Sequence, residues 1–279
     1  ISSLMTKLSM FCLTLNPNHL NLIKNLGYKP VGLGNSNFSN DWLTDKNQNT
    51  IHHKNRFYGE YTFHYTLWKN NFLNFEGWIG FCQYRKFWVT NQKVNENISL
   101  ETFKSLVLKE VPEKFFNYES IIGEELFVNK FRFSKFVKRN IKKMMLNPSL
   151  FFEKSKRTIK FHFDMMHGDG NLEKAIELLD KSEKNDFTNF VNTEVSFNPH
   201  NMFICKNKKI LIAYYDSLFP WLERCEKIFG FESLEGYGLK RIYGFLAERY
   251  MSYWFKKYTK FAVLPIYFKD IEEFSYKNL

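Results

Sequence analysis

The sequence lacks several features that would place it at once in a common protein class. It has no apolar run of about eighteen residues and no signal peptide, so we expect no membrane-spanning helix. It contains no Gly-x-Gly-x-x-Gly, P-loop or kinase signature, which argues against a dinucleotide-binding Rossmann site and against a phosphotransferase. Its 4 cysteines are scattered without a Cys-x-x-Cys pair, a pattern typical of reduced thiols in a cytosolic protein.

The sequence also has little proline and glycine, with 7 and 13 residues among 279, and no stretch rich in them divides the chain. Hydrophobic residues make up 44% of the chain, which is enough for a sizeable core. We therefore predict a single domain over residues 5–279, with a basic helical insertion near residues 128–160.

Positive charge and aromatic rings are abundant by contrast. The formal net charge is +11, which indicates an anionic partner such as nucleic acid, an anionic membrane or a phosphorylated ligand. Phe, Tyr and Trp make up 19% of the chain, and exposed aromatic faces serve as stacking platforms in sugar-binding proteins. An AT-rich genome is the simpler explanation for part of the lysine and phenylalanine content.

Residues 128–146 predict a strongly amphipathic basic helix, which is typical of a segment at a membrane surface. The alternative is a helix that packs on the core with a solvated basic face. Six apolar residues share one predicted face, namely Phe133, Phe136, Val137, Ile141, Met144 and Met145. Six cations share the other, namely Arg132, Lys135, Lys138, Arg139, Lys142 and Lys143.

The chain alternates predicted strands and helices, which favours an α/β fold. Strands are predicted over residues 8–15, 30–34, 78–82, 118–122 and 262–267. Helices are predicted over residues 20–25, 57–70, 100–107, 172–179, 209–229 and 241–257, with Asn171 as the cap of the fourth. The strand over residues 78–82 is followed at once by Gln83, Tyr84, Arg85 and Lys86. Ligands of open α/β sheets bind at such carboxyl ends, so this sequence suits an anionic ligand; a solvated surface loop is the alternative.

Four blocks carry a resemblance to a known family. They are the region of residues 56–70 (RFYGEYTFHYTLWKN), IGFCQYRKFW at 79–88, PHNMFI at 199–204 and GFLAERY at 244–250. In order and spacing they resemble a bacterial glycosyltransferase family, long described as a domain of unknown function, found among capsule and lipopolysaccharide genes. Characterised members transfer galactofuranose from UDP-galactofuranose. The chain departs from the family pattern at Gln83 in place of His, Lys86 in place of Arg and Gly59 in place of Cys.

The resemblance implies a GT-A-like domain with a central mixed, mostly parallel sheet flanked by helices. It implies inverting transfer of galactofuranose or a derivative from a UDP-sugar to a surface-polysaccharide acceptor, either a glycan or a lipid-linked glycan. It places the protein in the cytoplasm, whereas peripheral contact with the inner face of the membrane is what the basic helix over residues 128–146 predicts. The alternative is a non-catalytic basic protein that binds membrane or nucleic acid. The cations concentrate at residues 130–160 without a nucleic-acid motif, so we expect no nucleic-acid partner.

The transferase hypothesis assigns roles to particular residues. Binding of the donor phosphates is assigned to Gln83, Tyr84, Arg85 and Lys86. Arg85 is favoured because a guanidinium can bind a phosphate in a bidentate geometry. Glu60 is the first candidate for the general base that takes the proton of the acceptor hydroxyl, and Glu248 is the second. His167 and His200 are further alternatives. Sugar or acceptor contacts are assigned to His167, His200, Asn201 and Arg249. The structural alternatives are a surface pair of Glu60 with His64, and an ion pair that satisfies Glu248 within its helix.

The sequence contains no Asp-x-Asp, the motif with which many GT-A enzymes hold a metal. We therefore expect that no metal is required, although a divalent metal stays open. His162, Asp164, His167 and Asp169 have residue types and spacing that suit a metal site, and a structural or substrate-binding role is the other interpretation.

Overall fold

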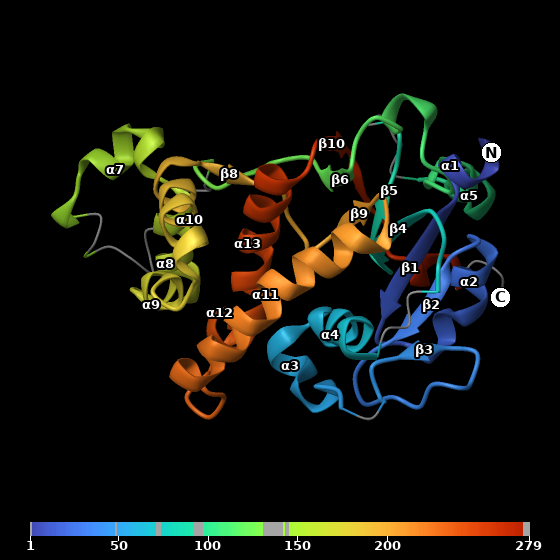
Figure 1. Ribbon diagram of the computed structural model, residues 1–279, viewed down its shortest axis with the longest axis horizontal. Coiled ribbons are helices and arrows are strands. Elements are labelled where there is room, and N and C mark those ends of the chain that lie inside the picture. The colour runs from blue at the N-terminus through green and yellow to red at the C-terminus, as the bar shows by residue number, and fades with distance from the viewer. Residues whose placement is uncertain are drawn as a thin grey trace. The chain divides into compact units, whose positions relative to one another are not determined.

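The chain divides into two units, and each unit is assembled from separate stretches of the sequence (Figure 1). A computed structural model describes residues 2–47, 49–70, 74–91, 97–130, 142 and 145–275. Unit 1 contains residues 1–124, 201–216 and 254–279, and unit 2 contains residues 125–200 and 217–253. Two long helices, α11 (Lys208–Phe229) and α13 (Ile242–Tyr258), contribute residues to both units. The single domain over residues 5–279 stays a prediction.

A mixed β-sheet forms the centre of unit 1. Along the order β10-β6-β9-β4-β1-β2-β3, four of the six pairings are parallel, and β9 runs antiparallel to both of its neighbours. β5 pairs antiparallel with β4 and with β11. The strands are β1 (Leu8–Thr14), β2 (Lys29–Gly32), β3 (Leu43–Thr44), β4 (Trp78–Gln83), β5 (Lys86–Trp88), β6 (Ser120–Gly123), β9 (Phe203–Cys205), β10 (Phe261–Leu264) and β11 (Ile266–Phe268). The predicted mixed, mostly parallel sheet is confirmed.

Alternation of side chains along β1 explains how the sheet is covered on both faces. Met10 and Cys12 belong to a buried cluster with residues of α2, α5 and α14. Phe11 points to the other face, where its ring lies 5.6 Å from Phe63 of α4 and 5.5 Å from Phe81 of β4. The helices of unit 1 are α1 (Ser2–Thr6), η1 (Pro17–His19), α2 (Leu20–Asn25), η2 (His52–Lys54), α3 (Asn55–Tyr58), α4 (Tyr61–Asn70), α5 (Leu100–Leu106), η3 (Glu113–Phe115) and α14 (Glu272–Ser275).

The helix predicted over residues 57–70 is in fact two helices. α3 ends at Tyr58, and the φ of 58° at its C-cap residue Gly59 is a conformation that glycine adopts without a steric penalty. Glu60 lies in the turn before α4, so the predicted pairing of Glu60 and His64 on one helical face is wrong. His64 is buried, and its Nδ1 lies 2.6 Å from the hydroxyl of Tyr215.

Helices make up most of unit 2. They are α7 (Ser149–Phe152), η4 (Lys154–Lys156), α8 (Ile159–His167), α9 (Asn171–Ile176), α10 (Lys181–Thr193) and α12 (Tyr237–Lys240), with parts of α11 and α13 and a ribbon of β7 (Leu126–Phe127) and β8 (Ser196–Phe197). Trp221 is buried in their core beside Phe187, and its indole N–H donates to the carbonyl of Ala175. Gly170 is the N-cap residue of α9, so the prediction of Asn171 as the cap is wrong.

The predicted basic helix over residues 128–146 lies largely outside the described residues, because residues 131–141, 143 and 144 are not among them. Across the described ranges, no helix combines the length and the hydrophobicity that crossing a membrane requires.

Candidate functional site

Polar side chains gather at the carboxyl ends of β1 and β4 in unit 1. The two strands are parallel neighbours with Leu13 opposite Gln83, so their ends reach the same edge of the sheet. Gln83 pairs with Lys86 of β5, and the chain therefore reverses over Tyr84 and Arg85. This turn places the residues that are predicted to bind the donor phosphates at the edge where ligands of α/β sheets bind.

Arg85 presents an exposed guanidinium at this edge. Its side chain is 60% exposed, and its Nε donates to Oδ2 of Asp270 at 3.0 Å. The guanidinium also lies 4.9 Å from the centre of the Tyr84 ring, which favours the cation and fixes its position. The ammonium of Lys86 instead lies 5.9 Å from the centre of the Phe268 ring on β11. Of these two cations, Arg85 is therefore the stronger candidate to bind an anionic ligand.

A chain of hydrogen bonds links the end of β1 to the C-terminal segment. Nε2 of His19 lies 3.0 Å from Oε1 of Glu272, and Nδ1 of His19 lies 2.7 Å from the hydroxyl of Thr14. The side-chain amide of Asn16 donates to the same Glu272 oxygen at 2.6 Å. This amide contact is the main cause that lowers the pKa of Glu272, whereas burial lowers the pKa of His19. A neutral His19 then donates to Glu272 and accepts from Thr14.

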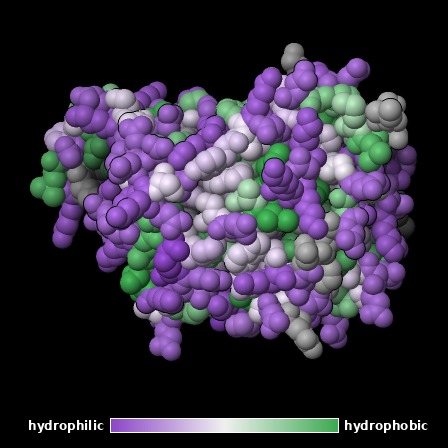
Figure 2. All heavy atoms as spheres, viewed as in Figure 1, coloured by the Kyte–Doolittle hydropathy of each residue, from purple (hydrophilic) through white to green (hydrophobic). Residues whose placement is uncertain are grey.

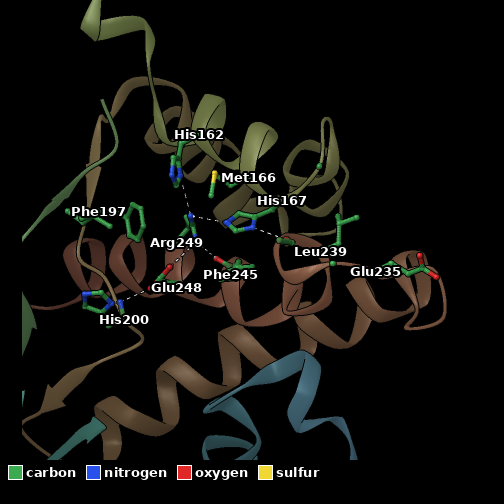
Figure 3. Close-up of a pocket in the computed structure, with 14 residues that line it drawn as sticks. His162, Met166, His167, Phe197, His200, Glu235, Leu239, Phe245, Glu248 and Arg249 are labelled. Carbon is green, nitrogen blue, oxygen red and sulfur yellow. Dashed lines mark hydrogen bonds and ion pairs between the residues drawn. The ribbon is translucent and has the colours of Figure 1, made fainter. Parts of the chain in front are cut away.

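Unit 2 contains a separate pocket of about 590 Å³ (Figure 3). α8 supplies His162, Met166 and His167, and α13 supplies Phe245, Glu248 and Arg249. Gly238 of α12 also lines it, and a Cβ there would lie 2.1 Å from the carbonyl oxygen of Met166. Glycine therefore allows α12 to approach α8, which brings the Gly238 carbonyl within 2.8 Å of Nδ1 of His167.

Arg249 lies at the centre of the polar groups of this pocket (Figure 3). Its Nη1 donates to Oε1 of Glu248 at 2.9 Å and to the carbonyl of Phe245 at 3.2 Å. Its Nη2 lies 3.4 Å from Nδ1 of His162 and 3.3 Å from Nε2 of His167. A guanidinium only donates, so both imidazole nitrogens must accept. The predicted ion pair of Glu248 with its neighbour is thus present.

The two histidines of the pocket are held neutral. Burial, and then the charge of Arg249, lower the pKa of His162 to about 3 and that of His167 to about 2. His167 donates through Nδ1 to Gly238 and accepts at Nε2 from Arg249, so both ring nitrogens are engaged. His162 accepts at Nδ1, which leaves its proton on Nε2.

Glu248 is held from two sides. Its Oε1 accepts from Arg249, and its Oε2 accepts from the backbone N–H of His200 at 2.6 Å. His200 and Asn201 have φ values of 74° and 55°, a left-handed pair that costs on the order of 1 kcal/mol per residue. This strained turn directs the His200 N–H to the carboxylate, and it explains why the PHN sequence precedes β9.

The residues proposed for a metal do not gather around one point. His162 and His167 both face Arg249, whereas Asp164 accepts from Lys160 at 2.9 Å. In the part of the chain that the structure describes, no group of three or more His, Cys, Asp or Glu side chains is arranged to hold a metal ion. The expectation that no metal is required stays a prediction.

The conserved pattern of a protein family covers nearly the whole chain. The DUF4422 family, described as a domain of unknown function, matches residues 13–260. The chain belongs to this family. No curated protein matches this DUF4422 chain.

Two solved structures resemble the DUF4422 chain. The apo structure of the WbbM bifunctional glycosyltransferase has a TM-score of 0.64 and 18% identity, and the match covers 94% of this chain and 45% of WbbM. The chain thus spans less than half of WbbM, and the likeness establishes the predicted GT-A-like fold. Core-mannan synthase A from Aspergillus fumigatus, in its Mn/GDP form, has 11% identity over 94% of this chain and 74% of that one, with a TM-score of 0.34 that is too low for an argument.

The structure of the DUF4422 chain groups the predicted site residues into separate places. His167, His200, Glu248 and Arg249 line the pocket of unit 2, while Asn201 is buried and follows the strained turn. Gln83, Tyr84, Arg85 and Lys86 lie at the sheet edge of unit 1, and Glu60 lies half-buried in the turn before α4. The predicted roles of all these residues stay predictions.

The sequence interpretation missed four polar residues at these two places. His19 was assigned to a turn, although its place after a buried strand was a usable signal. Asp270 and Glu272 are more than 180 positions from Arg85 and 250 from His19, and no local pattern connects them. Glu235 reaches the pocket of unit 2 from an irregular segment.

Proposed function

We propose that this chain is a glycosyltransferase that moves a sugar from a UDP-sugar to a glycan acceptor. The observation that carries the proposal is the GT-A-like fold, shared with a glycosyltransferase over 94% of the chain. The exposed Arg85 at the carboxyl edge of the sheet supports it, because a guanidinium suits the leaving diphosphate. The resemblance of the four sequence blocks favours galactofuranose or a derivative as the sugar, and a cytoplasmic step in capsule or lipopolysaccharide assembly.

Turnover with a panel of UDP-sugars, followed as UDP release, tests the function. We expect release with UDP-galactofuranose when a glycan acceptor is present. We also expect release to persist in excess EDTA, since Arg85 supplies fixed positive charge at the sheet edge. No release with any UDP-sugar would contradict the function, and complete loss in EDTA that manganese restores would contradict the metal-independent mechanism.

UDP binding should respond in opposite directions to two substitutions at the sheet edge. Arg85→Ala should weaken UDP binding roughly tenfold or more, because hydrogen bonds to a charged group are lost. Asp270→Asn should strengthen it, because Asp270 competes with the diphosphate for the guanidinium. An amide at residue 270 still accepts the N–H of Glu272 through its oxygen, so the local turn is preserved.

Isothermal titration calorimetry with UDP measures both changes. Lys104→Ala is the matched control, because Lys104 forms an ion pair with Glu101 on α5 and is a cation of the same unit. Unchanged affinity in a folded Arg85→Ala protein would reject the role of Arg85.

We propose in addition that unit 2 contacts an anionic membrane, where a lipid-linked acceptor would be located. Residues 128–157 hold ten cations and one acid, Glu153, and thus carry most of the net charge of +11. Met145, Leu146 and Phe152 are 74%, 85% and 85% exposed, and hydrophobic side chains lie at the left edge of Figure 2, where Figure 1 shows α7. Buried Arg157 donates to the carbonyl of Leu150 and so anchors this region. Long apolar side chains among cations suit a lipid surface.

Binding to vesicles should therefore depend on anionic lipid and decrease with salt. Cations near such a surface contribute about 1 kcal/mol each, so Lys154→Glu combined with Lys156→Glu should weaken co-sedimentation with phosphatidylglycerol vesicles by at least roughly tenfold. Lys174→Glu with Lys181→Glu is the control, because both lysines are exposed elsewhere on unit 2. Equal binding to neutral vesicles, or preferential binding to RNA or DNA, would contradict the proposal.

A further inference from the structure

The pocket of unit 2 combines apolar surfaces with a few polar groups. Phe197 and Phe245 lie on its wall together with Met166 and Leu239 (Figure 3). Its volume of about 590 Å³ falls in the usual range for small-molecule sites, roughly 300 to 1,000 Å³. A saccharide presents both C–H faces, which pack on such apolar walls, and hydroxyl groups, which require hydrogen-bonding partners.

The positive charge of Arg249 is not available to a ligand in this pocket. The side chain is 2% exposed, and its Nη1 and Nη2 together contact four acceptors of the protein. Its guanidinium lies 4.5 Å from the centre of the Phe197 ring and 5.3 Å from that of Phe163, which covers it further. Its Nε is buried and has no hydrogen-bond partner among the described residues, so this N–H does not face the cavity either. Arg249 therefore binds protein groups.

The polar groups that line the cavity suit hydroxyls and oppose anions. Glu248 is 15% exposed on its side chain, and each of its oxygens accepts one hydrogen bond, which leaves lone pairs for a ligand hydroxyl. Glu235 lines the cavity from an exposed position. His162 carries its proton on Nε2 and lines the cavity as a neutral imidazole. Among the described residues that line the cavity, no cation is accessible to a ligand, so the two carboxylates repel a phosphate or a uronate.

We infer that this pocket binds an uncharged saccharide through Glu248, His162 and its aromatic walls, and that Arg249 acts as a positioning residue. This inference rests on the proposed function, in which the saccharide is the glycan acceptor. Arg249 fixes the Glu248 carboxylate and directs the Nδ1 lone pair of His162, so that the other ring nitrogen keeps the proton. The donor diphosphate has no place in this pocket.

Binding of small glycosides to the full chain without donor tests the inference directly. Methyl galactoside and methyl glucoside are the neutral probes, and methyl glucuronoside and galactose 6-phosphate are the anionic ones. Saturation-transfer NMR detects contact, and chemical-shift titration gives Kd. We expect a neutral glycoside to bind at least roughly tenfold more tightly than either anion, because like charges in the pocket oppose the anions. Excess UDP should not displace it.

Substitutions of the two carboxylates should narrow this preference. Glu248→Gln and, on the rim, Glu235→Gln remove negative charge with little change of shape, so the anionic glycosides should gain affinity relative to the neutral ones. Glu173→Gln is the control, because Glu173 is exposed on α9 outside the pocket. Tighter binding of an anionic glycoside to the unmodified chain, displacement by UDP, or no binding of any neutral glycoside would overturn the inference.

The role of Arg249 has its own readout. Arg249→Met removes the charge, so the pKa values of His162 and His167 should rise toward 6.5, as followed by imidazole NMR. Unchanged values in a folded variant would reject the positioning role. Absence of UDP binding and of turnover, with glycoside binding intact, would contradict the proposed function but not the present inference. UDP binding without neutral glycoside binding would reject only the present inference.

Discussion

Glu60→Gln should reduce turnover by roughly a hundred- to ten-thousandfold with donor and acceptor saturating, which is the usual contribution of a general base. Glutamine keeps the shape of the side chain in the turn before α4 but cannot accept the proton of the acceptor hydroxyl. Glu60 is half-buried there, directly after the left-handed Gly59. Its place is therefore fixed by the break between α3 and α4.

Single-turnover rates of acceptor glycosylation measure the effect. Glu76→Gln is the matched control, because Glu76 is an exposed glutamate of unit 1. In contrast, Glu248→Gln should act mainly on the KM for the acceptor, since both oxygens of Glu248 already accept hydrogen bonds from the protein. Near-normal turnover in Glu60→Gln together with a collapse in Glu248→Gln would transfer the role of base to Glu248.

Lowering the pH from 7 to 5 should destabilise the fold by about 2 kcal/mol for each deeply buried histidine. Burial lowers the pKa of His64 to about 3, and burial with the charge of Arg249 lowers that of His167 to about 2, against an ordinary 6.5. The fold favours the neutral form, so this stability is complete above pH 6.5. It decreases as the pH falls toward 3, because the unfolded chain then binds more protons.

Urea unfolding followed by circular dichroism at pH 7 and pH 5 measures this slope. His167→Gln should lower stability at pH 7 and flatten the pH dependence, because one titrating group is removed. His53→Gln should change neither, since His53 is exposed. A stability that is independent of pH between 7 and 5 would contradict the neutral state of these histidines.

The elements that the sequence predicted well are those whose signal is local. The buried run before Gln83 became β4, and the helix over residues 20–25 has the predicted limits. Prediction failed where one residue changes the backbone. Gly59 divides a predicted helix in two, and Pro265 separates β10 from β11 where one closing strand was expected.

The sites were harder to predict because their partners are distant in sequence. The GFLAERY block places Glu248 beside Arg249, and that ion pair was foreseeable. His162 and His167 were attributed either to a metal or to the substrate, and local spacing has no means of showing that Arg249, more than 80 residues away, lies against both. Local spacing likewise does not show that Glu272 accepts a hydrogen bond from His19, because the two residues are 253 positions apart.

The path of the backbone constrains how this protein can be dissected. The chain leaves unit 1 after residue 124, returns at residue 201, leaves again within α11 and returns within α13. No single cut releases either unit, and two of the four crossings fall inside continuous helices. Domain exchange with a relative therefore requires breakpoints at residues 124 and 201 together with matched helical sequences for α11 and α13. Exchange at a junction inside α11 or α13 alone would join halves of unlike helices.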